Sequence, residues 1–137
     1  MARLSLSKNI TALRLAATMA IDTAAEQERG KYLTLGSGQA MVYDQKRREA
    51  EEFIANPEIS DGEIPHLVAE AAKNQISKYD QAVIYLTMRQ QWLTISPIIE
   101  TKRLAAKSAV AAAQTPTEIE QAQIIDWTEL AILTGAQ

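Results

Sequence analysis

Apolar residues recur every three or four positions along most of this chain, which is the period of an α-helix. Over residues 9–29 they form one stripe, made of Ile10, Leu13, Ala17, Ala20 or Ile21, and Ala24. Gly30 follows the stripe directly and is a typical helix end. Because the stripe is mostly alanine, we expect this helix to pack closely against another helix or against a copy of itself.

A second helix is predicted over residues 39–55, after a glycine-containing loop at residues 32–38. In the loop, Gly36 and Gly38 are free to take positive φ, and Ser37 is a candidate N-cap. One side of the helix is apolar and consists of Val42, Tyr43, Ala50, Phe53 and Ile54. The opposite side is interpreted as a solvated, ion-paired face, consisting of Lys46, Arg47, Arg48, Glu49, Glu51 and Glu52.

The third predicted helix is short. Asn56-Pro57 ends the helix before it, because a residue that precedes proline is disfavoured in the α region. Residues 58–63 read as a turn, and Pro65 can open a helix that reaches Asn74. Its expected buried side consists of Leu67, Val68, Ala71 and Ala72.

The longest predicted helix spans residues 78–114, and Ser77 with Asp80 resembles a capping box at its start. It carries two apolar stripes, one of Val83, Leu86 and Leu93 and one of Ile84, Met88, Trp92, Ile95 and Ile99. A helix that is apolar on two sides is expected to have neighbours on both. Pro97 should kink this helix or split it near Ser96, because proline removes a backbone hydrogen bond and crowds the preceding turn.

The two ends of the chain are candidate docking segments. Thr115-Pro116-Thr117-Glu118 predicts a new helix that leads towards Trp127, with threonine as N-cap and proline at the first position. After it, residues 128–137 have almost no polar face, so they are expected to fold back on the core or to bind a partner. Residues 1–8 are consistent with a short strand or a docking arm, although frayed termini are common. The candidate interface residues are Leu4, Leu6, Leu130, Ile132 and Leu133.

Taken together, these patterns predict an all-α fold. We expect an antiparallel helical bundle or hairpin of about four or five helices, with the Pro97-interrupted helix at its centre. By size, residues 1–137 are expected to form a single helical domain that is large enough to bury one core.

Composition narrows the class of protein. The chain has no cysteine, which excludes disulfides and thiolate chemistry and fits a reducing cytoplasm. It has no run of roughly 20 uncharged apolar residues, so we expect a soluble protein rather than a membrane-spanning one. Its net charge of −3 gives no field that would gather nucleic acid or an anionic membrane. Residues 1–21 alone are basic, as a targeting segment would be, but their apolar stripe continues unbroken into the next turns.

No catalytic residue, metal ligand or cofactor is predicted. His66 is the only histidine, which excludes a histidine metal cluster or a triad containing a second histidine, and we interpret it as a surface or capping residue. The acidic clusters at residues 49–52 and 58–63 do not have calcium-loop spacing and are interpreted as surface pairs. The glycines of the loop lack the spacing of a phosphate-binding loop. An enzyme is therefore not expected.

One segment carries a family resemblance. The run A-I-D-x-x-A-E-x-x-R at residues 20–29 is followed by Y-L-T-x-G-S-G-Q-A-M-V-Y-x-x-K-x-x-E-A at residues 32–50. This pattern resembles small helical proteins and fibre-linked segments encoded among the tail genes of tailed bacteriophages. A weaker similarity continues through Trp92, residues 98–107, residues 115–122 and Trp127. The chain departs from the pattern at Leu35, where proline is common. The positions taken as loop or structural signatures are Gly36, Gly38, Tyr43, Pro97 and Trp127.

The resemblance implies a virion or assembly component, made in the host bacterial cytoplasm, that joins or supports tail fibres or the baseplate. Its implied partners are itself, as a homo-oligomer with three copies favoured because phage fibres are usually trimeric, and other tail or fibre proteins. Nucleic acid and membrane are not implied. Three alternatives stay open: a tail-assembly chaperone absent from the mature particle, a head-to-tail connector subunit, and a small regulator that binds nucleic acid through its basic N-terminus.

Overall fold

The structure is a computed structural model that describes the backbone of residues 2–135 and the side chains of residues 9–36 and 38–135. The described residues form helices, turns and connecting segments and contain no strand, so the expected all-α class is confirmed. Contacts divide the chain into two compact units, unit 1 with residues 1–33 and 95–137 and unit 2 with residues 34–94. The single-domain organisation stays a prediction.

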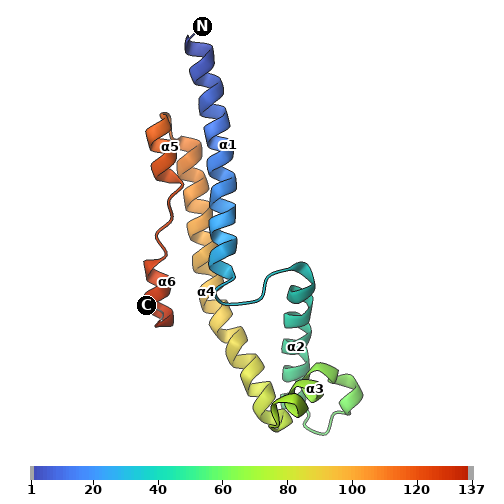
Figure 1. The fold of residues 1–137 in the computed structure, drawn as a ribbon. Helices are drawn as coiled ribbons and strands as arrows, with labels where there is room; N and C mark the ends of the chain where they lie inside the picture. The colour runs from blue at the N-terminus through green and yellow to red at the C-terminus, as the bar shows by residue number, and fades with distance from the viewer. Residues whose placement is uncertain (1, 136–137) are drawn as a thin grey trace. The chain divides into compact units, whose positions relative to one another are not determined.

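Figure 1 labels the helices of both units. Unit 1 contains α1 (Ala2–Arg29), α5 (Pro116–Ala122) and α6 (Thr128–Thr134). Unit 2 contains α2 (Ser37–Ala55), the short 3₁₀ helix η1 (Asp61–Glu63) and α3 (Pro65–Asn74). Helix α4 (Lys78–Ala112) belongs to unit 2 up to Thr94 and to unit 1 from Ile95.

Two expectations about the backbone differ from the structure. Helix α4 runs through Pro97 without a split, and the kink expected there as the other outcome stays a prediction. Helix α1 already begins at Ala2, so residues 2–8 are not a strand; no glycine or proline stands before Asn9 to stop the helical period. The side chains of Leu4 and Leu6 lie outside the described residues, so their role in docking stays a prediction.

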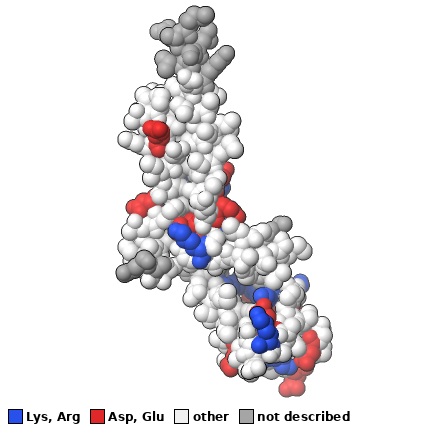
Figure 2. Space-filling view, viewed as in Figure 1, with Lys and Arg blue, Asp and Glu red and all other residues white. Residues whose placement is uncertain are grey.

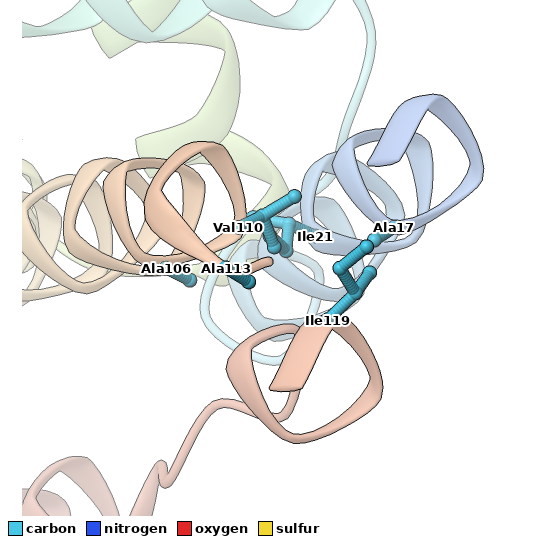
Figure 3. Close-up of a cluster of buried hydrophobic side chains, with 6 residues drawn as sticks. All are labelled: Ala17, Ile21, Ala106, Val110, Ala113 and Ile119. Carbon is cyan, nitrogen blue, oxygen red and sulfur yellow. The ribbon is translucent and has the colours of Figure 1, made fainter. Parts of the chain in front are cut away.

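The core of unit 1 is built from small side chains. Ala17 and Ile21 of α1 face Ala106 and Val110 of α4, with Ala113 just beyond that helix and Ile119 of α5 completing the cluster (Figure 3). Alanine at these positions lets the two long helices approach closely, as the stripe in the sequence predicted.

Polar contacts fix the direction of α1 and α4 within unit 1. An Arg14 Nη2 donates to the carbonyl of Ala113 at 2.6 Å, Arg103 meets Asp22 at 2.9 Å, and Arg29 meets Glu100 at 3.1 Å. Residue numbers rise along one helix while they fall along the other, so this pair of helices runs in opposite directions.

The core of unit 2 joins three helices. One buried cluster is formed by Ala50 and Phe53 of α2, Ile64 and Leu67 at the start of α3, and Ala82 and Tyr85 of α4.

The glycine loop that leads into α2 differs from expectation in detail. Gly36 takes φ 123° and is the N-cap, whereas Gly38 lies inside the helix without positive φ, and Ser37 is the first helical residue rather than the cap. Tyr43 fixes this loop, because its hydroxyl accepts a hydrogen bond from the Thr34 amide at 3.0 Å.

Capping predictions hold elsewhere. The Thr115 hydroxyl accepts from the Glu118 amide at 3.2 Å, and the Glu118 carboxylate accepts from the Gln114 amide at 2.7 Å. At the start of α4, the Ser77 hydroxyl accepts from the Asp80 amide at 3.0 Å. These local signals therefore place α5 and α4 where the sequence predicted them.

Candidate protein interaction surface

The C-terminal candidate interface residues separate into one core residue and two exposed ones. Leu130 is 0% exposed, so its assignment to an interface is wrong: it is the side chain by which α6 packs into unit 1. Ile132 and Leu133 are 75% and 54% exposed, as an interface would need. Trp127 is half-buried and stands at the N-cap of α6.

One polar contact adds to the docking of α6, because Lys102 of α4 meets Glu129 at 3.5 Å. Burial, together with the Glu28 carboxylate to which the hydroxyl donates at 3.3 Å, raises the pKa of Tyr32. The tail is thus part of unit 1, and its exposed large apolar side chains are Ile132 and Leu133.

The part of α4 in unit 2 leaves several large apolar side chains exposed. The sequence predicted neighbours on both sides of this helix, but Val83, Ile84, Met88 and Leu93 are between 41% and 50% exposed. The helix buries instead a narrower strip around Gln81, Ala82 and Tyr85, because α2 and α3 cover only that side. Within residues 78–94 these side chains are therefore not covered as expected, whereas Ile95 and Ile99 of the second predicted stripe are buried in the part of α4 that belongs to unit 1.

A groove of about 480 Å³ lies along this face. It is bounded by the end of α2 and by α4, and its lining consists of Ile54, Tyr79, Val83, Leu86, Thr87, Gln90 and Gln91. No charged side chain lines it. Two nearby cations are paired, Arg89 with Glu51 at 3.9 Å and Lys78 with Asp61 at 2.9 Å.

A second apolar surface belongs to unit 1. Leu15 and Met19 of α1 and Leu104 of α4 are exposed, and residues 9–21 and 104–117 contain only two charged side chains, Arg14 and Lys107. Both are engaged internally, the arginine with Ala113 and the lysine with Asp22 at 2.7 Å. Figure 2 shows the consequence on one face of the molecule, where the region next to the grey N-terminal atoms is mostly white.

The hydrogen-bonded group around Glu49 was not predicted from the sequence. Glu49, expected on the solvated face of α2, is 0% exposed. One of its oxygens accepts from the backbone amides of His66 at 2.7 Å and Leu67 at 3.0 Å. The other oxygen accepts from the side-chain amide of Gln45 at 2.9 Å and lies 2.7 Å from Nδ1 of His66. Glu49 therefore caps the N-terminus of α3 from a neighbouring helix.

The reason for this cap is local. The N-cap of α3 is Ile64, whose side chain cannot accept a hydrogen bond, so the first amides of α3 need an acceptor from elsewhere. Glu49 directly precedes Ala50 and lies one turn before Phe53, both of them core residues, so helical spacing places it at the buried edge of α2. The spacing of Glu49 relative to Ala50 and Phe53 was the sequence signal that could have predicted its burial. The charged residues on either side of Glu49 instead suggested a solvated face.

Electrostatics keep the Glu49 carboxylate ionised. Burial by itself would raise its pKa, but the hydrogen bonds from the Leu67 amide, Gln45 and His66 outweigh burial, and the net pKa lies below its ordinary value. Beside it, Glu70 is held by Lys46, and its pKa is also lowered although burial opposes this. Burial and Glu70 raise the pKa of Tyr85, so that hydroxyl stays protonated.

This arrangement is a structural clamp on the start of α3. One Glu49 oxygen accepts from two backbone amides, and the other lies 2.7 Å from Nδ1 of His66. The Tyr85 hydroxyl donates to the carbonyl of His66 at 3.2 Å and so joins α4 to the same turn.

Two searches of the described residues bear on other classes of site. Over residues 2–135 no cluster of three or more histidine, cysteine, aspartate or glutamate side chains is placed to hold a metal ion. In the same part of the chain no helix combines the length and the apolar character needed to cross a bilayer. Comparisons of the chain with protein-family models, with curated proteins and with solved structures gave no match.

Proposed function

We propose that this chain is a non-enzymatic structural protein of a phage virion, a helical joint associated with the tail fibres or the baseplate. It acts by self-association and by contact with other tail or fibre proteins, and its helices form an antiparallel bundle in the assembled state. In this proposal it binds neither nucleic acid nor membrane and needs no cofactor.

The observation that carries the proposal is the amount of exposed apolar surface. Large apolar side chains are exposed on α1, α4 and α6, including Met19, Met88 and Ile132, and an uncharged groove lies along α4. Monomeric proteins rarely leave contiguous apolar patches of this kind open, and such patches mark surfaces that bind other proteins. The resemblance of residues 20–50 to tail-region proteins supplies the setting, and the trimeric symmetry of fibres supports three copies.

The experiment that tests the proposal is detection of the chain in purified particles of a phage that encodes it. Particles separated on a density gradient are digested, and peptides of this chain are quantified against a known tail protein. A fixed ratio that corresponds to a multiple of the tail symmetry supports a virion component. Presence in infected cells together with absence from particles overturns it in favour of an assembly chaperone.

A further inference from the structure

We draw no further inference here: the strongest candidate, the groove between the end of α2 and α4 that is lined by Ile54, Tyr79 and Val83, is an unpartnered apolar surface, and nothing in the structure shows what covers it.

Discussion

Replacing Glu49 tests the clamp that joins α2 to α3. In the folded chain this fully buried carboxylate accepts four hydrogen bonds, from Gln45, from both the amide and the ring of His66, and from the Leu67 amide. Glu49→Ala removes the acceptor and leaves two amides at the start of α3 without a partner. Each buried donor left unsatisfied costs about 1–3 kcal/mol, and two are left, so we expect a loss of roughly 2–6 kcal/mol.

A loss of this size is a large share of the total free energy of unfolding. A domain is stable by about 5–15 kcal/mol, so Glu49→Ala should shift the urea unfolding midpoint strongly when helix content is followed at pH 7. Glu49→Gln keeps one oxygen for the backbone amides of α3 and should lose less, about 1–2 kcal/mol. The matched control is Glu52→Gln, an exposed glutamate on the same helix, which should stay within about 0.5 kcal/mol of wild type.

The pH dependence gives an independent check. The pKa of Glu49 in the folded chain lies below its ordinary value of 4.5, because hydrogen bonds to the carboxylate outweigh burial. The stability that its ionised form contributes is therefore fully present above about pH 4.5 and is lost as pH falls through the folded pKa. The gap between wild type and Glu49→Gln should narrow in this acidic range. A gap that stays constant between pH 7 and pH 3, or equal effects of Glu49→Ala and Glu52→Gln, would refute the clamp.

Four further substitutions, one of them with a control, are informative. Leu130→Ala should cost about 2–5 kcal/mol in chemical unfolding because it empties a buried site, whereas Ile132→Asp should stay near wild type; equal losses would contradict the packing of α6. Gly36→Ala should lower the melting temperature by an amount equivalent to about 1–3 kcal/mol, since φ 123° disfavours any side chain although space is open there. Gln75→Gly should stabilise by up to about 1 kcal/mol, because its φ of 57° strains a non-glycine residue; a loss in urea unfolding would argue against that strain. Thr115→Ala should cost about 1 kcal/mol by removing the α5 cap, and an unchanged urea midpoint would mean the cap is dispensable.

Local sequence signals predicted the helices well because they act over a few residues. Pro65, Thr115-Pro116 and Asn56-Pro57 placed helix ends where the structure has them, since caps and proline geometry depend on the adjacent backbone alone. Predictions that depended on more than the adjacent residues were less successful. Pro97 was expected to kink or to split α4, and the split does not occur, because one lost hydrogen bond is tolerated inside a helix that continues for many residues on either side.

The candidate interface and the Glu49 cap were likewise predicted only in part. The sequence marked the C-terminal tail as apolar, but could not tell that Leu130 faces the core while Ile132 and Leu133 face outwards. It marked Glu49 as one charge among several, although its neighbour Ala50 and the nearby Phe53 are buried. Which member of a charged run is buried depends on what packs against it, and no local pattern contains that information.

By itself, the sequence determined the all-α class, most helix boundaries and the lack of cysteine chemistry, because backbone propensity, capping and composition are properties of short segments. Only the tertiary structure decided which apolar stripes are covered. It buried Ala17, Ile21 and Leu130, left Val83 and Leu93 open, and brought Glu49 to the first amides of α3. Burial and polar pairing arise between segments distant in the chain, so they follow from packing rather than from periodicity.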